Sequence, residues 1–184
     1  MEKGYFQIVK YIVEHGVKLG NKNYTVTDLE CLKYLHNNYY KFGLDDIHNV
    51  VHSQKFDSLV YLVNTGININ KNIFNDKFPD MNLNILEYLF NRGCKLTDEL
   101  CMTVIRKNRI DCLKFMFNVG YKFRNNILLE TIISNAYDCF VFLHCNNFEL
   151  KSIIEDIISY KRTNFLEYII DKIDKNDFIN IDGK

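Results

Sequence analysis

The residues whose spacing comes closest to that of a metal site are His48 and His52, which stand four positions apart. Side chains at this spacing share one face of a helix and could hold the same metal ion. Asn49 follows His48 where the zinc-protease motif HExxH has glutamate, and the sequence places no further ligand close by. We therefore expect no metal and no cofactor, and a metal-dependent enzyme is the weakest of three functional hypotheses.

The chain has six cysteines, among which no CxxC pair and no zinc-finger spacing occurs. Cys31, Cys112 and Cys139 recur at one position of a repeated pattern described below, whereas Cys94 and the two others, Cys101 and Cys145, stand elsewhere. We expect all six to be reduced and largely buried thiols that pack as small apolar side chains.

Two adjacent carboxylate pairs, Asp45-Asp46 and Glu155-Asp156, are the remaining candidates for acid-base chemistry. Neighbouring residues of a helix do not face one another, so we expect these pairs on solvated helix surfaces. The sequence also lacks a glycine-rich phosphate loop and a GxSxG motif. The chain is therefore expected not to be an enzyme.

The charge balance argues against polyanionic partners. Lys and Arg number 23, as do Asp and Glu, so the formal net charge is zero and no overall positive field attracts nucleic acid or anionic lipid. No apolar stretch is long enough to span a membrane, and the first residues do not resemble a secretory signal. We expect an intracellular protein in the cytoplasm that binds neither nucleic acid nor membrane.

The elements that must position these residues are set by a repeat. A short pattern with an aromatic residue between apolar ones returns seven times, as in SLVYLV from Ser58 and ILEYLF from Ile85. The second residue of each copy serves as an anchor, and the steps between anchors are 23, 27, 27, 27, 27 and 26 residues. The anchors are Val9, Leu32, Leu59, Leu86, Leu113, Phe140 and Leu166. Self-similarity at such a period is typical of a solenoid, in which each unit packs on its neighbours.

Each full unit is expected to be a pair of helices. In TDELCMTVIRKN from Thr97, apolar residues recur with helical periodicity, and CLKFMFNV from Cys112 forms a second helix. Glycine ends the second helix at Gly16, Gly66, Gly93 and Gly120, with Asn147 in the sixth copy and Asn38 in the second. Gly4, Asn108 and Asn135 are expected in the turn between the helices.

Polar residues near the helix starts are expected to act as caps. Asp111, Asp57 and Asp138 recur just before or at the start of the second helices, with Asn84 and Asn164 as equivalents. Thr27 and Glu30 have the spacing of a capping box in the second copy. Lys77 and Pro79 should shorten or bend the first helix of the fourth copy.

The unit GYFQIVKYIVEHGVKL from Gly4 resembles the second helix and the glycine turn of an ankyrin repeat, and SLVYLVNTGININ is similar again. Ankyrin repeats have about 33 residues, so a period of 27 leaves out roughly the β-hairpin finger. The resemblance implies an all-α, ankyrin-like solenoid of stacked helix pairs with shortened or absent fingers. In composition and degenerate repeats the chain is similar to the ankyrin-like proteins of amoeba-infecting giant viruses, which would place it in a host cell.

We expect one repeat domain over residues 1–184. Its units are expected at residues 1–19, 20–42, 43–69, 70–96, 97–123, 124–150 and 151–175, followed by a tail at 176–184. In ankyrin-like stacking the exposed positions of the first helices line a groove. The projected groove residues are His48, Asn49, His52, Asn75, Asp76, Met102, Thr103, Arg106, Leu129, Glu130 and Ile133.

Met102, Arg106, Leu129 and Ile133 form the candidate partner-binding site, because apolar residues outside the buried columns beside an arginine are typical of interfaces. The alternative is that the apolar three pack against neighbouring first helices. The leading functional hypothesis is a non-enzymatic scaffold for protein-protein interaction that presents this groove to another protein. The second hypothesis is a structural or targeting arm, or a decayed fragment, of a larger repeat protein.

Overall fold

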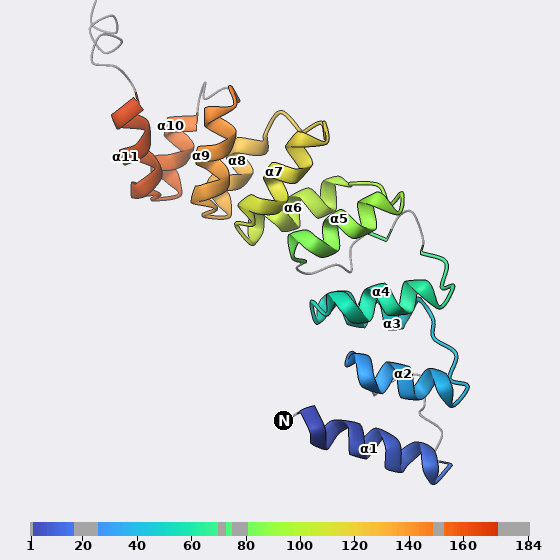
Figure 1. The fold of residues 1–184 in the computed structure, drawn as a ribbon. Coiled ribbons are helices and arrows are strands. Elements are labelled where there is room, and N and C mark those ends of the chain that lie inside the picture. The colour runs from blue at the N-terminus through green and yellow to red at the C-terminus, as the bar shows by residue number, and fades with distance from the viewer. Residues whose placement is uncertain (1, 17–25, 70–72, 75–80, 149–152, 173–184) are drawn as a thin grey trace, which may run out of the picture. The chain divides into compact units, whose positions relative to one another are not determined.

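The structure is a computed structural model that describes residues 2–16, 26–69, 73–74, 81–148 and 153–172 (Figure 1). These residues form eleven α-helices and no strand, which confirms the all-α prediction for this part of the chain. The chain divides into two compact units, Met1–Leu100 and Cys101–Lys184. The predicted boundaries of the repeat units stay a prediction.

The first unit is a row of packed helices. Its helices are α1 (Glu2–Glu14), α2 (Leu29–Asn37), α3 (Leu44–His52), α4 (Phe56–Asn64) and α5 (Leu83–Asn91). The helices that carry the anchors follow one another, because α1 packs on α2, α2 on α4 and α4 on α5. The helix α3 packs beside α4, so residues 43–69 form one helix pair.

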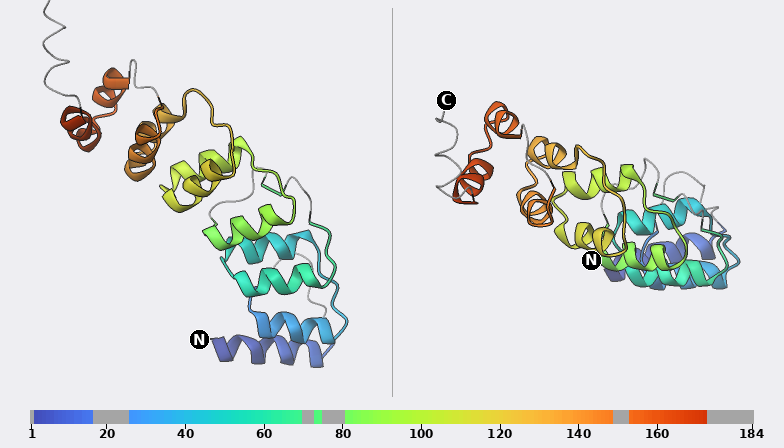
Figure 2. Two further views of the ribbon diagram at one scale, coloured as in Figure 1. Left: turned by 45° about the horizontal axis from the view of Figure 1, so that its top comes forward. Right: turned by 90° about the horizontal axis from the view of Figure 1, so that it is seen from above.

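The second unit contains α7 (Ile110–Asn118), α8 (Ile127–Ile133), α9 (Tyr137–Cys145), α10 (Ile153–Ser159) and α11 (Thr163–Lys172), and most of α6 (Asp98–Arg106), whose first turn belongs to the first unit. Contacts pair α8 with α9 and α10 with α11, and they also join α7 to α9 and α8 to α10. The first helix α8 therefore packs on the first helix α10, and the second helix α7 packs on the second helix α9 (Figure 2).

The anchor column forms the centre of the core. Six of the seven anchors are buried, namely Val9, Leu32, Leu59, Leu86, Leu113 and Phe140. The seventh anchor differs from the repeat pattern, since Leu166 is only half-buried, although the residue before it, Phe165, is buried as in the other later copies. Neighbouring copies supply the cover for an anchor, and no described helix follows α11.

Left-handed backbone conformations mark the turns. Gly16, Gly66, Gly93, Gly120, Asn108, Asn135 and Asn147 all have positive φ, as the sequence predicts. Two assignments are wrong: Gly4 lies inside α1, and Tyr39 rather than Asn38 takes the left-handed conformation, with φ of 63°. Gln54 and Lys161 adopt it in the turn between paired helices. This conformation costs about 1–2 kcal/mol for such residues. Packing of the paired helices must therefore outweigh the preference of Gln54 and Lys161 for other backbone conformations.

The predicted caps are displaced. Asp111, Asp57 and Asp138 lie within the first turns of α7, α4 and α9, whose N-caps are Arg109, Lys55 and Ala136. Asn84 lies inside α5 and Asn164 inside α11, so neither is an N-cap.

In the second copy, Asp28 rather than Thr27 caps α2, because its carboxylate accepts hydrogen bonds from the amides of Glu30 and Cys31. A preceding repeat supplies a cap to α9, where the side-chain oxygen of Asn108 accepts from the amide of Cys139 at 3.2 Å. The sequence around one helix does not reveal a cap that comes from another repeat. The predictions for Asn75, Asp76, Lys77 and Pro79 concern positions outside the described residues.

Candidate interaction surface

The candidate surface lies on α6 and α8, whose sequences each bury one face. Thr97 accepts a hydrogen bond from the amide of Leu100 at 3.2 Å, and acidic residues stand in the first turn of α6, where the helix dipole favours them. The buried face of α6 carries Leu100, Cys101, Val104 and Ile105, and that of α8 carries Ile127, Leu128, Thr131 and Ile132. The residues between these stripes point away from the core.

The four predicted site residues occupy that opposite face in the second unit. Met102 and Arg106 stand one turn apart on α6, and Leu129 and Ile133 stand one turn apart on α8. We call these four residues the first-helix patch. Arg106 is exposed and Ile133 is 38% exposed, whereas Met102 and Leu129 are half-buried. The views place α8 between α6 and α10 (Figures 1 and 2).

The other projected groove residues are less exposed than the repeat pattern predicts. Asn49 and Thr103 are half-buried, as are His48 and Glu130, whereas His52 is exposed. The guanidinium of Arg106 lies 3.4 Å from the hydroxyl of Thr103 and can donate a hydrogen bond to it. The first-helix patch therefore combines one exposed charged residue with apolar residues that are exposed or half-buried.

Arg162 is a residue that the sequence reasoning missed. It precedes α11, and its guanidinium donates from Nε to the carbonyl of Ile132 at 3.0 Å and from a terminal nitrogen to the carbonyl of Ile133 at 2.9 Å. These carbonyls belong to the last turn of α8, where a positive charge also suits the helix dipole. Arg162 thus holds the end of α8 that carries Ile133. Arg109 stands at the same repeat position in the fifth copy, which is the signal that could have suggested a role.

A second set of contacts links the second helices. The Nδ1 atom of His36 lies 2.7 Å from the hydroxyl of Tyr61, and that of His144 lies 2.9 Å from the hydroxyl of Tyr168. In both pairs the histidine is four residues after its anchor and the tyrosine two residues after the next anchor. Burial lowers the pKa of His144, and the nearby Lys172 lowers it further. His144 is half-buried and His36 is exposed. Both histidines contact a tyrosine of the next repeat and so contribute to packing between repeats.

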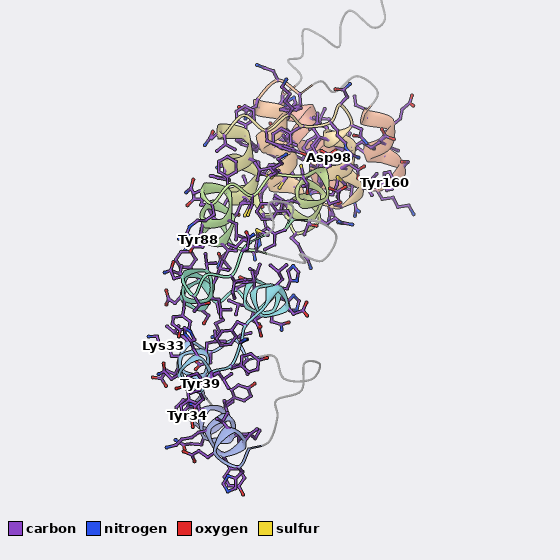
Figure 3. All side chains as sticks on the ribbon, turned by 90° about the vertical axis from the view of Figure 1, so that its right-hand side faces the viewer. Lys33, Tyr34, Tyr39, Tyr88, Asp98 and Tyr160 are labelled. Atoms are coloured by element: carbon purple, nitrogen blue, oxygen red, sulfur yellow. The ribbon has the colours of Figure 1, made fainter. Side chains whose placement is uncertain are left out.

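Tyr88 breaks this pairing, because Val63 stands at the histidine position before it. Tyr88 lies on α5 (Figure 3), and among the described residues its buried hydroxyl has no hydrogen-bond partner. Burial raises its pKa, although the Arg92 guanidinium opposes that shift and lies 4.9 Å from the ring centre.

We expect Tyr88→Phe to be neutral or to raise the free energy of unfolding by up to about 1 kcal/mol, because it removes an unsatisfied buried hydroxyl. The matched variant Tyr168→Phe should lower it by about 1 kcal/mol, because His144 then loses its partner. Urea unfolding followed by circular dichroism measures both. If the two variants lost equal amounts of stability, the Tyr88 hydroxyl could not be the one without a hydrogen-bond partner.

The structure places most of the cysteines in the core. Cys31, Cys94, Cys101, Cys112 and Cys139 are buried, whereas Cys145 is exposed, contrary to prediction. Burial is the main cause that raises the pKa of Cys31 and of Cys139 to about 12, which disfavours their reactive thiolate forms. The carboxylate of Asp46 accepts from the amide of Gly43 at 2.7 Å and so caps α3 rather than pairing with Asp45. Within the described ranges, no three His, Cys, Asp or Glu side chains gather in a metal-binding arrangement.

Two further findings concern membrane-spanning helices and the comparison with known proteins. In the part that the structure describes, none of the helices combines the length and the apolar character needed to cross a membrane. Comparisons of the chain with protein-family models, with curated proteins and with solved structures find no match.

Proposed function

We propose that the chain is an ankyrin-like α-solenoid that serves as a non-enzymatic scaffold for protein-protein interaction. The regular stacking of like helices and the buried anchor column support the solenoid. The connection between α7 and α8, which has no strand, supports repeats with a shortened finger. Its partner is another protein in the same intracellular compartment, since the balanced charge disfavours nucleic acid and anionic lipid.

The observation that carries the proposed function is the exposed apolar end of α8. Ile133 stays 38% exposed although its carbonyl is held by Arg162, so the end of the helix is firmly positioned while its side chain faces outward. An exposed apolar side chain and an exposed arginine in the same unit have the composition of a binding hot spot. Met102 and Leu129, which are half-buried, widen this surface and fix its shape.

The alternative, a structural or targeting arm of a larger assembly, is favoured by a different observation. Large apolar side chains are exposed on α1, α10 and α11, which carry Ile8, Ile158 and Ile170. Such ends would suit an array that is joined to other protein at its termini.

The test of the proposed function is the double variant Arg106→Glu with Leu129→Ser. We expect it to reduce recovery of the partner from the native cell by about tenfold or more, because hot-spot losses reach 2 kcal/mol or above. Recovery is quantified by affinity capture and mass spectrometry, after circular dichroism has shown that the variant is folded.

The matched control is Lys107→Glu, which reverses an exposed charge next to Arg106. It should leave recovery unchanged if the first-helix patch, rather than general charge, binds the partner. Undiminished recovery by the folded double variant would place the interface elsewhere, for example on the loops that follow the terminal glycines.

A further inference from the structure

The first helix of the structure exposes residues that later copies bury. Ile8 precedes its anchor by one residue and is 57% exposed, whereas all later residues at this repeat position are at most 2% exposed. These are Cys31, Ser58, Ile85, Cys112, Cys139 and Phe165. Tyr11, two residues after the anchor, is 63% exposed, although its counterparts are half-buried. We call Ile8 and Tyr11 the leading face.

The last helix pair exposes a different set of positions. Ile158 is 60% exposed, but its counterparts Ile105 and Ile132 are fully buried. Ile154 on α10 is 43% exposed, and Ile170 on α11 is 53% exposed. Leu166 is the only half-buried anchor among seven. We call Leu166 and Ile170, with Ile154 and Ile158 beside them, the trailing face.

Contacts inside the second unit explain why different positions open at the two ends. The anchor Phe140 packs on Phe165, the residue before the next anchor, with ring centres 4.8 Å apart. Phe117, four residues after its anchor, packs on Phe142, two residues after the next anchor, at 5.5 Å. His144 and Tyr168 repeat that second contact. Each interface between repeats therefore joins trailing-face positions of one copy to leading-face positions of the next.

We propose that the trailing face of one chain packs on the leading face of a second copy of the same chain. Leu166 then covers Ile8, as Phe140 covers Phe165, and Ile170 covers Tyr11, as Phe117 covers Phe142. The contact continues the interface between repeats that already exists within each unit. Because the two surfaces differ, the association is head-to-tail rather than a two-fold symmetric dimer.

The experiment uses two full-length variants, each blocked on one face. Ile8→Glu with Tyr11→Glu blocks the leading face, and Ile158→Glu with Ile170→Glu blocks the trailing face. All four side chains are more than half exposed, so folding should persist. Sedimentation velocity should show wild-type protein shifting from one chain toward larger species as its concentration rises. Each variant alone should associate at least tenfold more weakly.

The decisive sample is an equimolar mixture of the two variants. Each variant retains the face that the other has lost, so the mixture should recover association and stop at two chains. The control Leu44→Glu changes an exposed apolar residue in the first turn of α3, a helix that carries neither face, and should associate as wild type does.

Three results would overturn the proposal. Wild-type protein that remains a single chain at all concentrations would exclude self-association. A variant that still dimerises alone would point to a symmetric contact through one face. Association that begins only after removal of residues 173–184 would assign the trailing face to the chain's own C-terminal segment.

Discussion

Replacement of Leu113 by alanine should lower the free energy of unfolding by about 2–5 kcal/mol. Leu113 is fully buried in α7 and belongs to the anchor column of the second unit. The substitution removes several apolar atoms and leaves a cavity that neighbouring helices fill only partly. Leu86→Ala should have a loss of the same size in the first unit, where Leu86 is equally buried in α5.

Controls on the same helices separate this effect from helix propensity. Asn118→Ala on α7 and Asn84→Ala on α5 change exposed side chains and should alter the free energy of unfolding by less than about 0.5 kcal/mol. Thr103→Ala on α6 changes a half-buried side chain and gives a further comparison. Urea unfolding of wild type and the five variants ranks their free energies of unfolding. A loss at Asn118 as large as that at Leu113 would show that the helix faces are assigned wrongly.

The second large effect is expected from Arg162→Ala, which should lower the free energy of unfolding by about 2 kcal/mol. The variant loses two charge-assisted hydrogen bonds to the carbonyls of Ile132 and Ile133 and a positive charge at the end of α8. Arg162 is half-buried, so solvent replaces these bonds only in part.

Two further substitutions make this prediction specific. Arg162→Lys keeps the charge without the planar fork and should lose about half as much stability. Arg106→Ala removes an exposed arginine of the same unit and should lose less than about 0.5 kcal/mol. Hydrogen exchange provides a separate measurement, because the amides of α8 should exchange faster in Arg162→Ala. If Arg162→Ala and Arg106→Ala lowered the free energy of unfolding by equally small amounts, the hydrogen bonds from Arg162 to α8 would not contribute to stability.

Much of the fold was accessible from sequence, because its signals are local and repeated. The aromatic residue between apolar ones identifies each second helix, and the spacing of the anchors predicts that copies such as Leu59 and Leu113 share one environment. Glycine and asparagine identify most turns, since they adopt the left-handed conformation with little strain.

The candidate site was predicted less completely, because half of its features depend on residues from another repeat. The pattern places Met102 and Leu129 outside the buried columns, yet their exposed fraction depends on how closely neighbouring helices approach. Arg162 is about thirty residues away in sequence from the carbonyls that it binds, and nothing in the residues next to it indicates that contact. The predictions of helix caps were wrong for the same reason. Asn108, for example, caps α9 from the preceding repeat.

The sequence by itself determined the helical class, the position of each second helix and the residues of the anchor column, since periodic burial needs only the chain's own pattern. Only the tertiary structure decided that Tyr39 adopts the left-handed turn, that Tyr88 lacks a partner and that Ile8 and Ile170 stay exposed. The physical reason is that residues at the same repeat position can be buried in one copy and exposed in another. The difference depends on whether a neighbouring copy covers them. Coverage is a property of neighbouring helices and cannot be read from a single repeat.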